Sequence, residues 1–343
     1  MIGLRRYLVA GILLSLILSS VHLRANKDRN TSVTKTLLPV MSFPPESDEV
    51  LLDFPTGFQW EGEDYIYIID QNQSAIIKYS ADGKFIKQIG RQGEGPGEFE
   101  MPHEFFYDNK MLFIVDQGNR RVQILDSEGN YLSSFKLFRL IKNIVHFENT
   151  IIGQQQFRPH ELQDFSLITK YNHEGEILGS FGEPINKTIG ISKLPPIASK
   201  VMLKIYGNKI YVLYWYYPFL QVYSFKGELL KTYNFDNKIY RDLIPGNYNL
   251  QKILAAGNYV NLKYLFLAYD INDDGIFICL YKNNIEIHHY NFEGELQNIY
   301  VHKHKKDDEY YVRDLRVLDH KDTYKFYVLT YLPWPRVRVF TSN

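Results

Sequence analysis

The chain has 343 residues, and its 39 Lys and Arg balance 39 Asp and Glu, so the formal net charge is zero. A neutral chain has no overall field that draws in nucleic acid or an anionic membrane surface, so its charge predicts neither as a partner. Aromatic residues make up 15% of the chain. This composition favours strands and supplies material for a large core.

The first residues have the layout of a secretory signal. Arg5 and Arg6 precede an apolar stretch over residues 7–21, and Ala25 is a small residue at a suitable cleavage point. A basic head, a short apolar middle and a polar continuation are typical of such a signal. We therefore predict a signal peptide over residues 1–25 and an exported protein of the bacterial periplasm or cell envelope.

The alternative is an uncleaved N-terminal anchor formed by residues 7–21, which would be the one membrane contact of the protein. Residues 26–35 are expected to be a linker, followed by a single domain over residues 36–343. The only cysteine, Cys279, lies in an alternating apolar run. One thiol cannot form an internal disulfide, so we interpret Cys279 as a small buried core residue.

Five segments repeat one pattern of short apolar runs separated by polar turns, as in the runs at 65–70, 75–79 and 85–89. A further apolar run precedes each segment. The last turn of each segment carries a glycine, which supplies the positive φ that a tight hairpin needs. Four short strands in every ~40–50 residues are typical of a propeller blade. The turn glycines are Gly83, Gly129, Gly175, Gly227 and Gly294.

A sixth unit has runs at 315–318, 324–331 and 337–340, and the sequence ends where its last strand should follow. An open blade would expose unpaired backbone groups. Residues 36–43 form a strand-like run with no repeat of their own. The sequence thus predicts an all-β, six-bladed β-propeller with four-stranded antiparallel blades, in which the N-terminal strand at about 36–43 closes the last blade.

Two stretches resemble the NHL repeat. The sequence Gly-Arg-Gln-Gly-Glu-Gly-Pro-Gly-Glu-Phe at 90–99, followed by Pro102, resembles the linker of that repeat, and Phe113–Gln123 resembles its strand-turn-strand centre. The match is strong over 56–137, fair over 150–182 and architectural thereafter. The resemblance implies a six-bladed propeller like those common in bacterial envelopes, and it implies no particular activity.

The loops between the second and third strands of the blades should gather with the blade linkers on one face, around the central channel. We expect ligand binding on this loop-rich face, since aromatic rings with a few fixed donors suit glycan or peptide recognition. The turn from Asp116 to Asn119 is interpreted as structural. The predicted ligand contacts are Tyr214, Trp215, Tyr216, Tyr217, Trp334, Arg336, Arg120, Arg121, Arg158 and His160.

No constellation in the sequence commits the chain to a reaction. The histidines are scattered, and His302 and His304 lie in a charged segment that reads as solvated surface. We therefore predict a non-catalytic, monomeric propeller without a cofactor or metal, which binds a protein, peptide or glycan. The alternative is a metal-dependent hydrolase or lyase with ligands at the channel mouth, because two enzyme families that resemble this fold use metal.

Overall fold

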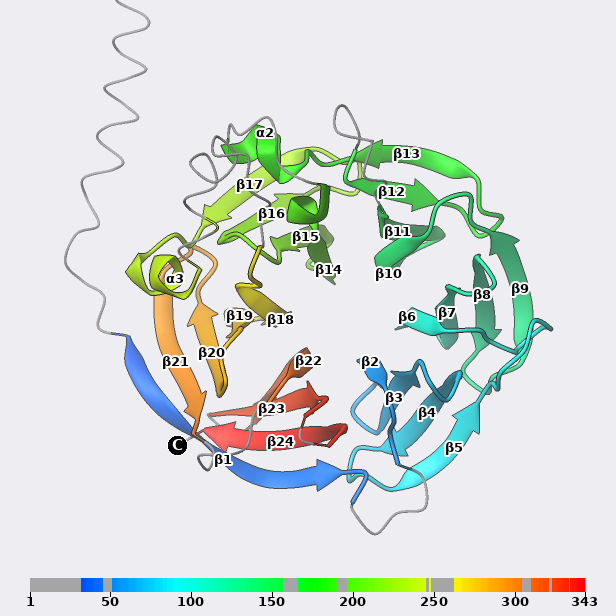
Figure 1. Cartoon of the computed structure of the whole chain (residues 1–343), viewed down its shortest axis with the longest axis horizontal. Helices are drawn as coiled ribbons and strands as arrows, with labels where there is room; N and C mark the ends of the chain where they lie inside the picture. Colours follow the sequence, from blue (N-terminus) through cyan, green and yellow to red (C-terminus); the bar gives the residue numbers. More distant parts are fainter. Residues whose placement is uncertain are drawn as a thin grey trace, which may run out of the picture.

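The computed structural model describes residues 32–45, 51–156, 166–189, 196–244, 247, 262–303, 310–320, 323–332 and 334–342. Six four-stranded blades surround a central channel, as Figure 1 shows, and two of them are joined in one eight-stranded sheet. The predicted six-bladed propeller is confirmed. The predicted signal peptide at 1–25 lies outside the described residues. None of the helices in the described part of the chain is long and apolar enough to span a bilayer.

Each blade runs from an innermost strand at the channel to an outermost strand at the rim. Blade 1 contains β2 (Pro55–Glu61), β3 (Tyr65–Asp70), β4 (Ala75–Ser80) and β5 (Phe85–Ile89). Blade 2 contains β6 (Pro102–Asp108), β7 (Met111–Asp116), β8 (Arg121–Asp126) and β9 (Tyr131–Lys136). Blade 3 contains β10 (Ile141–Phe147), β11 (Thr150–Gln155), β12 (Ile168–Tyr171) and β13 (Ile177–Phe181).

The second half of the ring follows the same order. Blade 4 contains β14 (Val201–Tyr206), β15 (Lys209–Tyr214), β16 (Phe219–Tyr223) and β17 (Leu229–Asn234). Blade 5 contains β18 (Phe266–Asn272), β19 (Gly275–Leu280), β20 (Ile285–Tyr290) and β21 (Leu296–His302). Blade 6 contains β22 (Val312–His320), β23 (Thr323–Thr330), β24 (Arg336–Ser342) and β1 (Val33–Phe43).

The middle strands of the blades carry the core. All six residues of β19 and all six of β20 are buried, because the neighbouring blades cover both faces of each sheet. Strands covered on both faces favour near-continuous apolar runs, which β19 has, whereas β20 also buries the polar residues Glu286, His288 and His289. Cys279 is one of these residues and is a buried free thiol, and burial raises the pKa of this thiol to about 12.

The two ends of the described chain meet in blade 6. Residues 37–43 of β1 pair antiparallel with β24, from Leu37 opposite Ser342 to Phe43 opposite Val337. This confirms the predicted closure. Residues 33–36 of β1 also pair in parallel with β21 of blade 5, so one strand joins two blades in a single sheet. In Figure 1, β1 runs outside β24 and beside the end of β21.

The turn glycines have a second role besides their backbone conformation. Gly175 has a φ of +85°, and a Cβ placed on it would lie 2.4 Å from Cδ2 of Phe135, in the outermost strand of the preceding blade. Gly129 packs in the same way on Ile89, where a Cβ would lie 2.9 Å from a side-chain methyl group. The hairpin turn of one blade therefore holds the rim of the previous blade.

In the described part of the chain, short helices lie between blades, namely α2 (Ile185–Ile189), η1 (Pro196–Ser199) and α3 (Lys238–Leu243). The side chain of Asn237 caps α3 by accepting a hydrogen bond from the Tyr240 amide. The fully buried Tyr240 then reaches blade 5, where its hydroxyl lies 3.0 Å from Nδ1 of His288. The insertion after blade 4 thus begins as a helix fixed to the core.

Candidate functional site

One backbone hydrogen bond recurs at the loop-rich end of the blades. In blade 4 the amide of Trp215, the residue after β15, donates to the carbonyl oxygen of Lys200, the residue before β14, at 3.0 Å. In blade 6 the amide of Tyr331 donates in the same way to the carbonyl oxygen of Tyr311, at 2.8 Å. Blades 1, 3 and 5 have the same bond. The residues just before the first strand and just after the second are therefore brought together in pairs.

These pairs divide the ring into two halves. After the second strand, blades 1 to 3 carry glutamines, whereas blades 4 to 6 carry aromatic residues: Gln71, Gln117, Gln156, Trp215, Tyr281 and Tyr331. We call the aromatic residues of the second half, together with the rings of the adjoining linkers, the aromatic half-ring. It consists of Trp215, Tyr264, Tyr281, Tyr311, Tyr331 and Phe54.

Ring contacts connect most members of the half-ring in sequence. The ring centroids are 5.1 Å apart for Trp215 and Tyr264, and 6.2 Å apart for Tyr264 and Tyr281. They are 6.2 Å apart for Tyr281 and Tyr311. Tyr331 and Phe54 form a further pair at 5.1 Å. The rings meet at steep angles, between 45° and 80°. Three of the six, Trp215, Tyr264 and Tyr311, form part of the wall of the central cavity.

Two cations are part of this wall. The Lys200 ammonium nitrogen lies 3.6 Å from the centre of the Trp215 ring. The Arg313 guanidinium lies 5.0 Å from the centre of Phe54, 4.9 Å from that of Tyr311 and 5.5 Å from that of Tyr331. It thus occupies the gap in the ring sequence between Tyr311 and Tyr331. Such placements over aromatic faces attract a cation electrostatically.

Burial lowers the pKa of Lys200 to about 8, and the positive charges of Lys142 and Arg313 act in the same direction. The carboxylate of Glu104 acts weakly against them. Within the described residues, no carboxylate forms an ion pair with Lys200 or Arg313. Perturbed ionisable groups in a cleft mark candidate functional sites.

A cavity of about 160 Å³ opens beside these groups, and all six innermost strands contribute to its walls. Its charged lining residues include Glu104, Lys142, Lys200, Lys204 and Arg313. Deeper charges are paired with one another. Lys204 lies 3.7 Å from Asp270 and 3.8 Å from Asp314, and Asp314 accepts a hydrogen bond from the Phe58 amide. The excess positive charge of the cavity is therefore concentrated at its mouth.

A model of one protein family, described as a 6-bladed beta-propeller and called DUF5128, matches residues 47–330. The chain belongs to this family. The DUF5128 propeller is also 31% identical over 88 residues to NHL repeat-containing protein 3 of Homo sapiens, and 27% identical to the Mus musculus protein. These matches cover 24% of this chain and 25% of either relative. The predicted NHL-like propeller is confirmed.

Solved structures agree on the fold. A Bacteroides fragilis protein named as exported is 12% identical, with a TM-score of 0.56 over 92% of this chain and 97% of the other. A DUF4221 family member from Bacteroides vulgatus is 10% identical, with a TM-score of 0.56 over 92% and 98%. Virginiamycin B lyase from Staphylococcus aureus is 9% identical, with a TM-score of 0.51 over 89% and 98%. Similarity at these identities establishes the fold alone.

In the DUF5128 propeller, three of the four predicted aromatic contacts at residues 214–217 lie in the core and one lines the cavity. Tyr214 is fully buried, and its hydroxyl donates to the Glu183 carbonyl oxygen at 2.9 Å. Tyr216 and Tyr217 are also buried among apolar side chains of the core. Only Trp215, the second residue of the run, lines the cavity. The other three rings are placed as packing residues.

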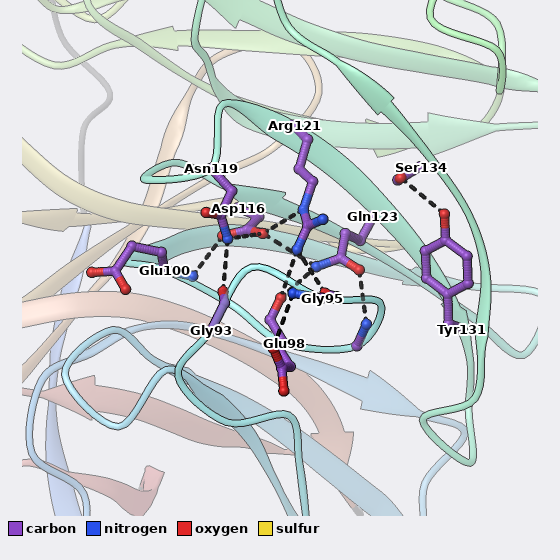
Figure 2. Close-up of polar contacts among 11 residues, drawn as sticks. Gly93, Gly95, Glu98, Glu100, Asp116, Asn119, Arg121, Gln123, Tyr131 and Ser134 are labelled. Atoms are coloured by element: carbon purple, nitrogen blue, oxygen red, sulfur yellow. Dashed lines mark hydrogen bonds and ion pairs between the residues drawn. The ribbon is translucent and has the colours of Figure 1, made fainter.

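Arg121 belongs to a structural network in blade 2. Asp116 is fully buried, and Nε of Arg121 donates to its carboxylate at 2.7 Å, while Nδ2 of Asn119 donates to it at 2.9 Å. Figure 2 shows these side chains directed at Asp116 and toward the Gly-rich linker. Arg121 also donates to the carbonyl oxygens of Gly95 and Glu98. The turn from Asp116 to Asn119 is thus structural, as predicted, and the Gly-rich segment is a blade linker.

The remaining predicted contacts are dispersed. Arg120 donates to the Phe138 carbonyl oxygen at 3.0 Å. Trp334 lies on the surface with 66% of its area exposed, whereas Arg336 is 9% exposed. Neither of these two residues lines the cavity. Arg158 and His160 lie outside the described residues.

Sequence reasoning missed most of the half-ring and both cations. The sequence does place each missed ring beside the end of a strand. Using this pattern requires knowing at which residue each strand begins and ends. The predicted innermost run at 264–269, for example, is a strand that begins at Phe266, which leaves Tyr264 in the linker. Among the described residues, no group of three His, Cys, Asp or Glu could hold a metal ion. The metal-dependent alternative stays an untested expectation.

Proposed function

We propose that the DUF5128 propeller is an exported, non-catalytic protein that binds a protein, peptide or glycan at the mouth of its channel, on the loop-rich face. The observation that carries the proposal is the aromatic half-ring with Lys200 and Arg313 set into it. Half-buried rings offer large apolar area at low entropic cost, and cations that form no ion pair with a carboxylate of the described residues are available to bind an anionic group.

Export is supported by two observations. The first is the basic and apolar layout of residues 1–25. The second is the name of the Bacteroides fragilis protein that shares the fold. The proposed location is the periplasm or the cell envelope, with residues 7–21 as the anchor if the leader is not removed.

The binding proposal can be tested with the protein's own fluorescence. The chain has three tryptophans, so the double variant Trp60→Phe and Trp334→Phe leaves Trp215 as the sole reporter. This protein would be titrated with a panel of saccharides and peptides of both charge signs. We expect a subset of the panel to change the Trp215 emission, and we expect this subset to bind about tenfold more weakly to Lys200→Met and Arg313→Met variants.

The control is Arg91→Ala, which removes a cation on the linker after blade 1 that is paired with Glu98 and lies outside the half-ring. It should leave every affinity unchanged. The proposal is wrong if millimolar concentrations of all panel members leave the emission unchanged. It is equally wrong if the Lys200 and Arg313 variants bind as tightly as the parent protein.

A further inference from the structure

The backbone at the channel mouth offers little to a peptide. The amides of Trp215, Tyr281 and Tyr331 donate to the carbonyl oxygens of Lys200, Leu265 and Tyr311 within the same blades. The Leu265 amide donates in turn to the Trp215 carbonyl oxygen at 2.8 Å. Peptides that bind as an added strand need free backbone groups along an edge. Side chains rather than backbone groups must therefore recognise a ligand at this mouth.

The side chains at the mouth present flat aromatic faces rather than narrow pockets. Trp215, Tyr264 and Tyr311 are each partly exposed and line the cavity, and the neighbouring rings of Trp215 and Tyr264 meet at 59°. A series of partly exposed rings suits a chain of rigid, puckered rings, whose C–H faces pack on aromatic faces. Sugar units have this shape, whereas a peptide presents flexible side chains of varying size.

The charge of the wall adds a second requirement. Arg313 is held over three rings at 4.9 to 5.5 Å, and Lys200 is held over two, Trp215 at 3.6 Å and Tyr264 at 5.5 Å. Both positive groups are fixed in the wall rather than extended into solvent. Lys204, deeper in the channel, differs from them because it lies within 4 Å of the carboxylates of Asp270 and Asp314. A ligand that stacks on the half-ring therefore meets two cations at the same level as the rings.

We propose that the ligand of this mouth is an acidic saccharide, a carbohydrate chain that carries carboxylates on its rings, as uronic acids do. Its ring faces pack on Trp215 and Tyr311, and its carboxylates pair with Lys200 and Arg313. This inference rests on the proposed function and narrows it to one class of ligand. A guanidinium is suited to a carboxylate because it can donate two parallel hydrogen bonds to it.

The test uses oligogalacturonides of about four to six units, the methyl esters of the same oligosaccharides, and a neutral galactose oligomer of equal length. Each would be titrated calorimetrically against the full chain in the presence of a chelator, which removes calcium-mediated effects. We expect the acid to bind at least tenfold more tightly than the ester or the neutral oligomer. The advantage should shrink as salt is raised, because charge pairing at a partly exposed site is screened.

Substitutions test the charge pairing and the ring packing separately. Arg313→Met and Lys200→Met should reduce the preference for the acid over its ester, whereas Trp215→Ala should weaken acid and ester alike. Phe138→Ala is the control, since Phe138 is 97% exposed and is not part of the half-ring. If one of the mouth variants fails to fold, the salt dependence of the unmodified protein still tests the charge component.

Three outcomes would overturn the inference. Equal affinity for acid and ester removes the charge requirement. Tighter binding of a matched Glu-rich peptide identifies a peptide ligand, which leaves the proposed binding function standing. Absence of binding by every saccharide and every peptide at millimolar concentration defeats both the inference and the proposed function.

Discussion

The propeller uses two different kinds of contact between neighbouring blades at its rim. At five junctions, a turn glycine of one blade packs against a large apolar side chain at the rim of the blade before it, as Gly175 does on Phe135. At the junction of blades 5 and 6, β1 instead pairs through its backbone with β21 and then with β24. Glycine packing thus serves every junction except that of blades 5 and 6, including the junction of blades 6 and 1, where Gly83 packs on Phe43. Backbone pairing by β1 serves the remaining junction.

This difference has a physical reason. Linkers of four to 31 residues tether consecutive blades, so less entropy is lost when they dock than in a contact between distant segments. Blade 6 must recruit β1, which the other five blades separate from β24 in the sequence, and a contact at that separation loses more. The backbone pairing from Leu37 opposite Ser342 to Phe43 opposite Val337, with one irregularity between Pro39 and Met41, offsets that loss.

The largest effect should come from removing the closing strand. Deletion of residues 32–43 exposes the edge of β24 and uncovers the pocket filled by Leu37 and Phe43, which are 1% and 0% exposed. We expect loss of the cooperative unfolding transition, together with aggregation, measured by calorimetry and size-exclusion chromatography. A chain that begins at residue 32 is the control. A soluble deletion variant with an unchanged melting temperature would refute the role of β1.

A smaller effect is expected at a glycine junction. Gly175→Val should lower the free energy of unfolding by about 3–4 kcal/mol, because the side chain meets Phe135 and the positive φ is unfavourable for a β-branched residue. Gly207→Ala is the matched control. Its φ is +53° and a Cβ there meets no atom within 4 Å, so it measures the backbone cost alone, about 1 kcal/mol. Equal losses in chemical denaturation would show that packing at the junction contributes nothing.

The junction contact can also be examined from its other side. Phe181→Ala should lower stability by about 3 kcal/mol, since Phe181 is 7% exposed and packs against Gly227. The added methyl group of Gly227→Ala should destabilise less when Phe181 is already alanine, because the ring atoms Cγ and Cδ1 that it would meet are gone, whereas the close approach to Cβ of residue 181 remains. A double-mutant cycle measures this coupling. Strict additivity would mean that the two residues do not act as a pair.

The smallest effect is expected at the channel mouth, where the native Lys200 lowers the free energy of unfolding. Lys200→Met should raise the free energy of unfolding by about 1 kcal/mol, because the charged amine is penalised by burial while the ring contact with Trp215 partly offsets that penalty. The folded pKa of about 8 lies below the ordinary lysine pKa of 10.5, so the unfolded chain binds more protons between these pH values. Wild-type stability should therefore rise with pH across this window.

The measurement is the difference in unfolding free energy between Lys200→Met and wild type as a function of pH. It should be largest at and below pH 8 and should vanish toward pH 10.5. A gain that stays constant with pH would mean that the amine's charge is not its source.

The sequence was sufficient for the fold because the signals repeat. A glycine at the last turn of each blade, apolar runs of strand length and a missing final strand together indicate six blades and their closure. The second contact made by β1, with β21, could not be foreseen, because parallel pairing across a blade junction leaves no pattern in the sequence.

The candidate site was harder to predict for a related reason. Tyr214 ends β15 and points into the core, while Trp215 follows the strand and reaches the cavity. A shift of one residue in the position of the strand end decides whether a side chain packs in the core or reaches the cavity. Composition does not locate a strand end to within one residue.

The pairing of β1 with β24 also sets the order in which the molecule can assemble. Five blades are built from strands close together in the chain, and they can form as hairpins while later parts are still being made. The sixth has to wait, because the other five blades lie between β1 and its neighbour β24 in the sequence. Until then β1 is an unsatisfied strand, and a second chain in the same state is a competing partner for it. Crowding of nascent chains should therefore favour exchanged dimers, in which each molecule completes the other's ring.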